Sequence, residues 1–386
     1  MSDHPRIYLD HAATSWPKSD AVLDAMDRFA RECGAAAGRG GYQSAAQADQ
    51  VIALTRRTLG RLIHAESPDC ISFHCNGTAA LNAAIHGVVA PGDHVVTTAA
   101  DHNSVLRPLH YLAQHHDLQL TVVPATSGGR VDPAQLLGAV TDETRLVVMT
   151  HASNVTGTVQ AINEVGQGLK QHDAMFLCDA AQTFGVVPLD VKACCIDLLA
   201  APGHKSSGGP LGTAFLYVSE GSHERLRPTI QGGTGSRSES LEMPTKMPSM
   251  LEAGNLNVPA IAGWLVALME LQETGVEARY QLAKTLAEQL HHGLASIEGL
   301  QVYGEPSDLP IASVNLDGVS PADAAVILDA EFGIETRAGL HCAALIHSCL
   351  GSSSDGTLRI SAGHTTTAAD IDAVVAALGM ITQELK

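Results

Sequence analysis

The sequence predicts an α/β fold, with a mostly parallel seven-stranded sheet in a large first domain and a smaller C-terminal α+β domain. Three observations carry this prediction. Short apolar, β-branched runs alternate with longer helical patterns through the first two-thirds of the chain. These runs are apolar on both sides of the pleat, as in strands that helices cover on both faces. The alternation stops near residue 220, where a different pattern begins.

The seven strands and the helices between them follow from this alternation. The strands are expected at Ile71–His74, Asp93–Thr98, Gln119–Pro124, Arg145–Thr150, Ala174–Asp179, Asp197–Ala201 and Ala214–Val218. The helices are expected near Ala79–Val89, Val105–Gln114, Pro133–Val140 and Asn163–His172. The third helix opens with Asp132-Pro133, an N-cap followed by proline at the first helical position. Strand–helix alternation at this spacing predicts mostly parallel strands.

The C-terminal third has a different organisation. Gly232–Gly235 and the polar stretch to Pro248 predict an irregular loop. A long helical region from Pro259 to about Ser296 follows, which Gly275 divides. The last elements expected are a strand at Ile311–Leu316, a helix at Pro321–Phe332, a loop through Cys342, a strand at Thr357–Ser361 and a helix at Thr367–Leu378, which Gly379 ends. The predicted domains are residues 15–258 and 259–386, with segment 1–14 packing on the second.

Composition excludes several classes of protein. Apolar residues make up 45% of the 386 residues, enough for a buried core, so a disordered chain is excluded. The formal net charge of −18 argues against nucleic acid as a partner, because binding phosphate backbones needs a basic face. No apolar run reaches membrane-span length, and the N-terminus lacks the layout of a secretion signal. Eight scattered cysteines without a C-x-x-C pair complete the expectation of a soluble, cytoplasmic protein with no membrane partner.

Polar residues stand at the carboxyl ends of five predicted strands, where open parallel sheets bind their ligands. They are Asn76-Gly77-Thr78, Asp101-His102-Asn103-Ser104, His151-Ala152-Ser153-Asn154, Asp179-Ala180-Ala181-Gln182 and Gly203-His204-Lys205. Together they offer an anion-binding turn at a helix start, a histidine, an asparagine, an acid and a lysine. Pyridoxal phosphate requires such a set: a lysine for a Schiff base, an acid for the pyridine nitrogen, a stacking group and a phosphate site.

Six short motifs occur in a familiar order. They are Tyr8-Leu9-Asp10-His11-Ala12-Ala13-Thr14, Asn76-Gly77-Thr78, Ser153-Asn154-Val155-Thr156-Gly157, Asp179-Ala180-Ala181-Gln182, Gly203-His204-Lys205 and Arg337-Ala338-Gly339-Leu340-His341-Cys342. Together they resemble the class V aminotransferase group of fold-type I pyridoxal phosphate enzymes, and within it the cysteine desulfurase and selenocysteine lyase branch. The resemblance spans nearly the whole chain and implies a large cofactor-binding domain with a smaller C-terminal one.

The resemblance implies a role for each matching residue. Lys205 would form the Schiff base, Asp179 would pair with the pyridine nitrogen, and His102 would stack on the ring and carry protons. Arg359 would bind the substrate carboxylate by a bidentate fork. On the phosphate side of the cofactor, the matching residues are Gly77, Thr78 and His204. On its phenolic-oxygen side they are Asn154 and Gln182, and Asn154 would also face the substrate. Arg39, in the glycine-rich stretch near the site mouth, is expected to contact a carboxylate or an interface.

Cys342 matches the nucleophile that takes sulfur from L-cysteine as a persulfide, leaving L-alanine. The chemistry requires a thiolate, which cationic neighbours favour, and Arg337 and His341 stand beside it in sequence. The resemblance thus implies a cysteine desulfurase, a homodimer with a shared active site, and a possible sulfur-acceptor protein. Selenocysteine lyase, or another class V lyase or aminotransferase, stays open as an alternative.

Two positions depart from the family pattern. Pro202 stands three residues before Lys205, where a serine or threonine often binds phosphate, and proline has neither a hydroxyl nor an N–H. Asn255 stands where the neighbouring subunit usually lends a threonine to the phosphate, and its amide can still donate a hydrogen bond. Weaker or rearranged phosphate binding is therefore expected.

Three other readings compete with this one. A dinucleotide oxidoreductase would need G-x-G-x-x-G after a strand, whereas the glycines of 34–41 follow a helical pattern. A zinc site would use His341, Cys342, His347 and Cys349, but their spacing matches no familiar zinc motif, and no metal is expected. A family member without turnover is disfavoured by its retained site residues. The pairs His115-His116 and His291-His292 are expected on solvated helix faces and absorb part of the 19 histidines.

Overall fold

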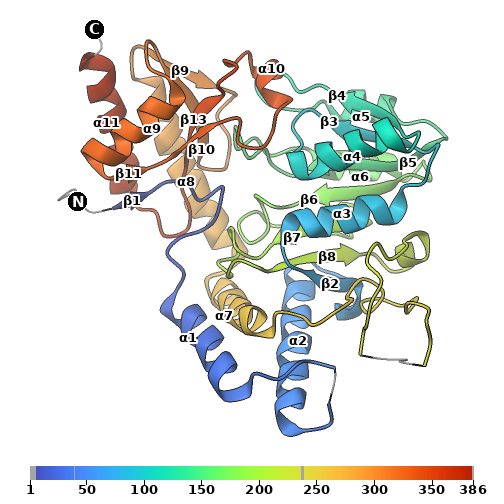
Figure 1. Cartoon of the computed structure of the whole chain (residues 1–386). Helices are drawn as coiled ribbons and strands as arrows, with labels where there is room; N and C mark the ends of the chain where they lie inside the picture. The colour runs from blue at the N-terminus through green and yellow to red at the C-terminus, as the bar shows by residue number, and fades with distance from the viewer. Residues whose placement is uncertain (1–5, 39, 236–238, 385–386) are drawn as a thin grey trace.

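The chain folds around a seven-stranded sheet, shown in the computed structural model of Figure 1, which describes residues 6–38, 40–235 and 239–384. The strands are β2 (Ile71–His74), β3 (His94–Thr98), β4 (Gln119–Val123), β5 (Thr144–Thr150), β6 (Met175–Asp179), β7 (Leu198–Pro202) and β8 (Ala214–Val218). Their order in the sheet is β2-β8-β7-β6-β5-β3-β4. Strand β8 runs antiparallel to both neighbours and every other pairing is parallel, so the predicted mostly parallel sheet is confirmed.

Both faces of this sheet are buried, as the two-sided apolar runs predict. Along β5, Leu146 and Val148 join one hydrophobic core, while Val147 and Met149 join the core on the opposite face. Because successive side chains of a strand point to opposite faces, one strand serves two cores. The edge strand β4 is the exception, with Gln119 and Val122 exposed.

Helices that follow the strands cover the sheet (Figure 1). They are α3 (Gly77–Val88), α4 (Asn103–His115), α5 (Pro133–Gly138) and α6 (Ile162–Leu169). Side chains cap three of them: Asn76 accepts from the Ala79 N–H at 2.8 Å, His102 from Ser104 N–H at 3.0 Å, and Asp132 from Ala134 N–H at 2.9 Å. Helices α3 and α4 therefore begin directly at the strand ends that carry the candidate site residues.

A helical layer from distant parts of the chain packs beside the sheet. It consists of α1 (Asp20–Arg28), a π-helical turn at Phe29–Cys33, α2 (Gln43–Leu62) and α7 (Val258–Thr274), with α7 against both α1 and α2. Trp264 of α7 is fully buried and donates its indole N–H to Ser207 Oγ at 3.0 Å. This layer therefore supports the chain that follows β7.

The C-terminal part contains a four-stranded antiparallel sheet with helices packed on it. The strands, in the order β12-β13-β10-β9, are β9 (Leu300–Tyr303), β10 (Ile311–Leu316), β12 (Arg337–Gly339) and β13 (Thr357–Ser361). The helices are α8 (Val276–Ala295), α9 (Pro321–Phe332), α10 (Ile346–Leu350) and α11 (Ala368–Glu384). The predicted break at Gly275 and the predicted bounds of β10, α9 and β13 are confirmed.

The predicted end of the last helix at Gly379 is wrong. Helix α11 continues to Glu384, and Gly379 does not adopt the left-handed conformation of a helix stop. Ile381, two residues beyond it, is 5% exposed and belongs to the C-terminal core. Burial of that side chain outweighs the local preference of glycine for a helix end, which amounts to about 1 kcal/mol.

The N-terminal segment reaches across to the C-terminal part. Strand β1 (Ile7–Tyr8) pairs in parallel with β11 (Ile334–Glu335), and Leu9 is fully buried in the C-terminal core. The chain then passes along the seven-stranded sheet before α1 begins (Figure 1). Of the described helices, none combines the length and apolar character that crossing a bilayer needs.

Candidate active site

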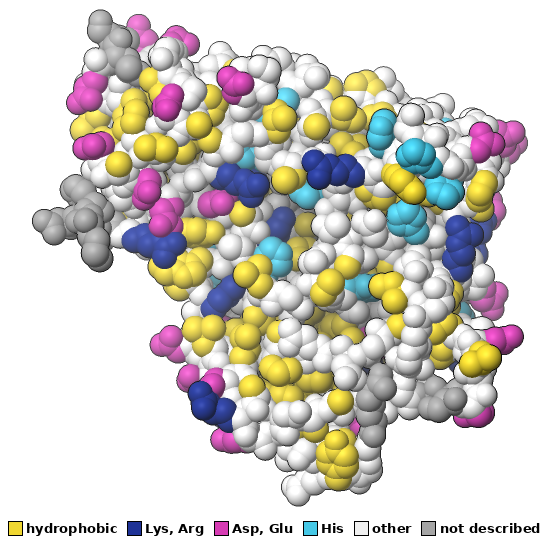
Figure 2. Space-filling view, in the orientation of Figure 1, with side chains coloured by type: hydrophobic (Ala, Val, Ile, Leu, Met, Phe, Trp, Pro, Cys, Tyr) yellow, Lys and Arg dark blue, Asp and Glu magenta, His cyan; other side chains and the backbone are white. Residues whose placement is uncertain are grey.

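A cavity of about 220 Å³ lies at the carboxyl ends of β5, β6 and β7, where α3, α4 and the C-terminal part meet. Ten of the predicted site residues line it: Gly77, Thr78, His102, Asn154, Asp179, Gln182, His204, Lys205, Cys342 and Arg359. On the face shown in Figure 2, acidic side chains lie mostly toward the outer edges, while several Lys, Arg and His side chains lie near the centre and others at the edges. Local groups therefore give the cavity a character unlike the net charge of −18.

One end of the cavity is suited to a phosphate. The main-chain N–H groups of Gly77 and Thr78 precede the first helical hydrogen bond of α3, from Ala80 N–H to Asn76 C=O, and so are free to bind an anion. Pro202 closes this end: a Cβ on Gly77 would lie 3.3 Å from its ring. The buried Nδ1 of His204 has no hydrogen-bond partner. An unpartnered nitrogen beside free amides fits the predicted phosphate position.

Lys205 and Asp179 form the centre of the cavity. Asp179 ends β6, is 3% exposed, and accepts the Ala181 N–H at 2.9 Å. Burial raises the pKa of this carboxyl, and the nearby Lys205 opposes that effect. Burial likewise lowers the pKa of Lys205 from 10.5 to about 8, with Asp179 opposing and Arg359 and Arg337 adding to the decrease. A cationic ring nitrogen would satisfy Asp179, and a neutral amine at Lys205 is the form that attacks an aldehyde.

The lowered pKa of Lys205 predicts how its amine would react with an aldehyde such as pyridoxal phosphate. The neutral amine becomes the major form above about pH 8, so the rate of covalent linkage should rise from about pH 7 and level off near pH 9. Stopped-flow measurement of the visible absorbance that the linkage produces gives this profile. A rate that keeps rising tenfold per pH unit through about pH 10 would show an ordinary lysine instead.

His102 is the N-cap residue of α4 and lies at the cavity wall. Its Nδ1 accepts the Ser104 N–H at 3.0 Å, so the neutral ring carries its proton on Nε2. Burial lowers its pKa to about 4, and the cationic groups of Lys205, Arg337 and Arg359 contribute. Ser104 also lies 2.7 Å from Thr78 Oγ1, which connects the phosphate end with His102.

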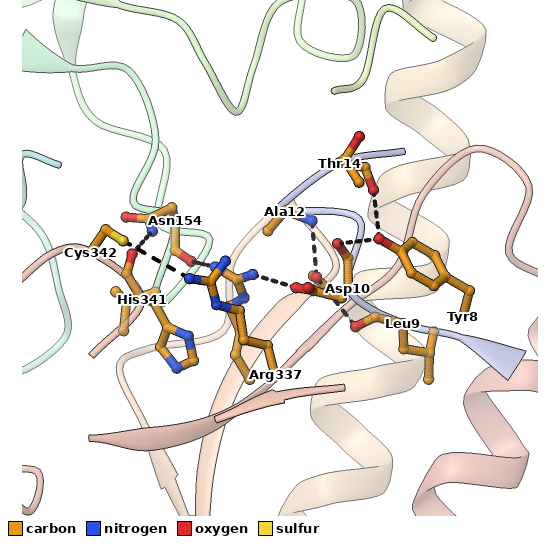
Figure 3. A network of polar contacts seen from close by, with 12 residues as sticks. Tyr8, Leu9, Asp10, Ala12, Thr14, Asn154, Arg337, His341 and Cys342 are labelled. Atoms are coloured by element: carbon orange, nitrogen blue, oxygen red, sulfur yellow. Dashed lines mark hydrogen bonds and ion pairs between the residues drawn. The ribbon is translucent and has the colours of Figure 1, made fainter. Parts of the chain in front are cut away.

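Arg359 is held by two partners from distant parts of the chain, Asp10 and Asn154, both labelled in Figure 3. It is 1% exposed, donates from Nη2 to Asp10 Oδ1 at 2.5 Å and from Nη1 to the Asn154 carbonyl at 3.1 Å, and its buried Nε has no partner. The unpartnered Nε marks the edge of the guanidinium that can receive another carboxylate. No signal in the sequence pointed to Asp10 as the partner of Arg359.

Asn154 contacts both Arg359 and the loop that carries Cys342. Its side-chain amide donates to the His341 carbonyl at 2.6 Å, while its own carbonyl receives Arg359. The tight turn that presents it is closed by a hydrogen bond from Gly157 N–H to Ser153 C=O at 2.9 Å. Gly157 has φ +73°, and a Cβ there would lie 2.7 Å from Ser307 Oγ, so the turn requires glycine.

The loop that carries Cys342 is strained and anchored. His341 and Cys342 have φ values of +50° and +58°, left-handed conformations that cost roughly 1 kcal/mol or more for residues with a Cβ. Asn103 N–H donates to the Cys342 carbonyl at 2.7 Å, adding to the bond from Asn154 to His341. These contacts hold the exposed Cys342 thiol at the cavity.

The two sequence neighbours of Cys342 differ in function. Arg337 Nη2 lies 3.9 Å from Cys342 Sγ and faces it in Figure 3. His341 instead bonds through Nε2 to the Thr357 carbonyl at 2.9 Å, and burial lowers its pKa to about 2. His341 is therefore neutral, and Arg337 alone of this pair supplies a positive charge beside the thiol.

One predicted site residue lies elsewhere, and another is not described. Asn255 does not line the cavity of this chain, and its predicted role is one for the neighbouring subunit. Arg39 lies outside the described residues; of its described neighbours, neither Gly38 nor Gly40 lines the cavity. For the zinc alternative, the described part of the chain contains no group of three His, Cys, Asp or Glu placed to hold a metal.

Comparison with known proteins agrees with this geometry. Residues 7–374 match the class-V aminotransferase family. A probable cysteine desulfurase of Methanothermobacter thermautotrophicus is 35% identical, with 96% of this chain and 93% of the relative covered. A cysteine desulfurase of Yersinia pestis is 30% identical, with 99% and 94% covered. The apo cysteine desulfurase of Thermococcus onnurineus has a TM-score of 0.91 at 27% identity, covering 98% of this chain and 95% of that one. Escherichia coli CsdA, a cysteine desulfurase in its S-sulfonic acid form, has a TM-score of 0.88 at 27% identity, covering 98% and 94%.

The sheet and its strand-end residues define an α/β protein of fold-type I. The chain belongs to the class-V aminotransferase family. Enzymes of this family generally depend on pyridoxal phosphate, and the residues present fit that group. They provide free N–H groups for its phosphate, a buried acid for its ring nitrogen and a lysine with a lowered pKa.

Proposed function

We propose that this chain is a pyridoxal-phosphate-dependent cysteine desulfurase, which converts L-cysteine to L-alanine and passes the sulfur to Cys342. The single observation that carries the proposal is the meeting of Lys205, Arg359 and Cys342 in one cavity. A lysine, a carboxylate-binding arginine and a thiol beside Arg337 are the groups that this reaction needs.

The cofactor and substrate would be held by the residues that line the cavity. Gly77, Thr78 and His204 would bind the phosphate, with Asn255 contributing from the neighbouring subunit. Asp179 would pair with the ring nitrogen, His102 would lie against the ring, and Gln182 and Asn154 would lie on its phenolic-oxygen side. When bound, pyridoxal phosphate supplies an electron sink next to the substrate amino group.

The protein's own groups then provide the positioning and the proton transfer. Arg359 would hold the substrate carboxylate, with Nε as its free donor. Lys205 would hold the cofactor through Nζ and then move protons at that atom. His102 would hold its proton on Nε2 at the cavity wall, since Nδ1 accepts from Ser104.

Cys342 would carry out the sulfur transfer. Its thiolate attacks the sulfur of the bound cysteine, so a sulfur–sulfur bond forms as the carbon–sulfur bond breaks. The electron pair remains on the carbon, which takes a proton and becomes the methyl group of alanine. Sulfur is oxidised and carbon is reduced within the same step, so no external oxidant is needed. Arg337 stabilises the thiolate that begins it.

Replacing Cys342 with alanine tests this function. Alanine and sulfide formation from L-cysteine should fall by about 100-fold or more, because the nucleophile is removed while the cofactor site is untouched. The measurement is alanine and sulfide release by holoenzyme of known cofactor content, with the exposed Cys75 replaced by alanine as the matched control.

The outcomes separate the candidate functions. A parent enzyme with full cofactor content and no activity on L-cysteine would contradict the desulfurase proposal. If the Cys342→Ala variant loses activity with cysteine but keeps activity with selenocysteine, the enzyme is a lyase that acts on both amino acids, because selenium leaves without the thiolate. Full cysteine activity of that variant would show that Cys342 is not the nucleophile.

The arrangement of the whole protein extends this proposal. We propose two domains, 15–258 and 259–386, with the cavity between them and segment 1–14 on the second. We also propose a cytoplasmic homodimer whose sulfur passes onward to an acceptor protein, with Arg39 near the site mouth. Sedimentation of the holoenzyme would test the dimer: a single species of monomer mass would contradict it.

A further inference from the structure

Cationic side chains donate hydrogen bonds to the main chain on both sides of Lys205. The His204 carbonyl, immediately before Lys205, accepts Lys18 Nζ at 2.9 Å. The Ser206 carbonyl, immediately after it, accepts Arg279 Nη1 at 2.9 Å. Lys18 comes from the N-terminal segment and Arg279 from α8, so both lie far from Lys205 in sequence.

The carbonyl before Lys205 is held especially firmly. Besides Lys18, it accepts the Ser15 N–H at 2.9 Å and Thr14 Oγ1 at 3.0 Å. Lys18 Nζ also donates to Ser15 Oγ at 2.7 Å, which joins these donors into one cluster. Ser15 Oγ also donates to this carbonyl, at 3.2 Å. A carbonyl commonly accepts one or two hydrogen bonds, so four donor groups from one segment fix this peptide plane.

Both cations are placed there at an energetic cost. Arg279 is 8% exposed, burial lowers its pKa, and burial lowers the pKa of Lys18 from 10.5 to about 8. Among the described residues, no carboxylate lies within ion-pair distance of either side chain. Buried cations usually have an acidic partner, whereas the half-buried Lys18 and the buried Arg279 bond to main-chain carbonyls, with Glu270 beyond ion-pair distance of Arg279. Hydrogen bonds from charged donors are stronger than those from neutral donors, and both cations direct theirs at carbonyls of the residues that flank Lys205.

The other fixed points of this segment are Gly203 before the lysine and the turn after it. Ser207 Oγ donates to the Gly203 carbonyl at 2.8 Å and accepts from Trp264, and Gly208 N–H donates to the Lys205 carbonyl at 2.8 Å. These bonds shape the turn, but none of them reaches the His204 carbonyl. That carbonyl is held by Thr14, Ser15 and Lys18. The reach of the Lys205 amine into the cavity thus depends on the N-terminal segment.

We propose that Lys18 and Arg279 are positioning residues that fix the main-chain carbonyls of the two residues flanking Lys205, and so place its amine for linkage to the cofactor and for proton transfer. The proposal rests on the proposed function only where turnover is concerned, because linkage to the cofactor does not involve cysteine. A misplacement of about 1 Å can slow a reaction up to about 100-fold, so losing the hydrogen bond from Lys18 or Arg279 should lower the linkage rate measurably.

The test compares Lys18→Met, Arg279→Met and Lys18→Arg with the parent. Lys284→Met is the matched control, since Lys284 lies at the surface, where it pairs with Asp308. The first readout is the rate at which apoprotein forms the borohydride-trappable link to pyridoxal phosphate at Lys205, located by peptide mass. The second is kcat against KM with L-cysteine.

We expect Lys18→Met and Arg279→Met to form the link, and to turn over, about 10-fold more slowly, with KM changed less than about 2-fold. Lys18→Arg, which keeps a charged donor, should recover most of the rate, and Lys284→Met should behave as the parent. Linkage rates of both Met variants equal to that of Lys284→Met would overturn the proposal. So would equal losses in Lys18→Met and Lys18→Arg, because the loss would then reflect packing.

Two further provisions keep the test decisive. If Lys18→Met does not fold, Lys18→Gln takes its place. A slower linkage rate of Lys18→Gln would then support the proposal, and a rate equal to that of Lys284→Met would overturn it. If the parent links to the cofactor but shows no activity with L-cysteine, the desulfurase proposal fails while the linkage rates still decide the role of Lys18 and Arg279.

Discussion

Replacing Lys205 with alanine is expected to lower desulfurase activity by about 1000-fold or more. Among the described residues, Lys205 is the one lysine that lines the cavity, and its amine would both hold the cofactor and move protons. A positioned acid–base group alone contributes about 100- to 10,000-fold, so losing both roles places the effect at the upper end. The measurement is alanine formation from L-cysteine by protein saturated with pyridoxal phosphate.

The same variant should remain folded. A lysine whose pKa is lowered by burial carries an unfavourable charge at pH 7, so removing it should not reduce thermal stability. Borohydride reduction should leave the cofactor extractable from Lys205→Ala and fixed to the parent. Lys192→Ala, at an exposed lysine, is the control. Activity of Lys205→Ala within about tenfold of the parent would contradict the assigned role.

The sheet and the cavity follow from local sequence signals. The seven strand predictions agree with the structure to within one residue at either end, because two-sided burial makes such runs distinct from amphipathic helices. Asn76, His102 and Asp132 cap the helices that follow three strands. Once those strands are parallel, their carboxyl ends meet at one edge, and this topology brings His102, Asp179 and Lys205 together.

The long-range contacts could not be predicted in this way. Asp10 and Arg359 are 349 residues apart, and Lys18 is 186 residues from the His204 carbonyl. Such pairs depend on how the N-terminal segment crosses between the seven-stranded and the four-stranded sheet. The periodicity of apolar residues predicts local elements and not this path. The direction of the His341 ring depends on a left-handed backbone and on Thr357, so its neutral state is equally hidden from the sequence.

Burial accounts for more of the histidines than the site does. His94 lies between Thr144 Oγ1 at 2.8 Å and Thr121 Oγ1 at 2.9 Å, and His74 lies 3.1 Å from Ser72 Oγ. Burial lowers the pKa of both, as it does for His151. A neutral imidazole can satisfy a hydroxyl inside the protein without burying a charge. The pair His115-His116, by contrast, is exposed at the end of α4, as predicted.

Replacing Arg359 with methionine is expected to raise KM for L-cysteine by about 100- to 10,000-fold. Two hydrogen bonds to a carboxylate from a charged donor contribute about 1.5–3 kcal/mol each, and each 1.4 kcal/mol corresponds to a factor of ten. The measurement is the concentration dependence of alanine formation. A KM within about threefold of the parent would show that another group binds the carboxylate.

Asp10 separates this binding role from a structural one. Arg359→Met leaves Asp10 without its partner, and an unpaired carboxylate that is 20% exposed should reduce stability by about 1–3 kcal/mol. Adding Asp10→Asn removes that charge, so the double variant should regain most of the stability, measured by urea unfolding. It should not regain substrate binding, because the guanidinium is still absent. If the double variant regains a low KM, then Arg359 acts by neutralising Asp10, and it does not hold the substrate.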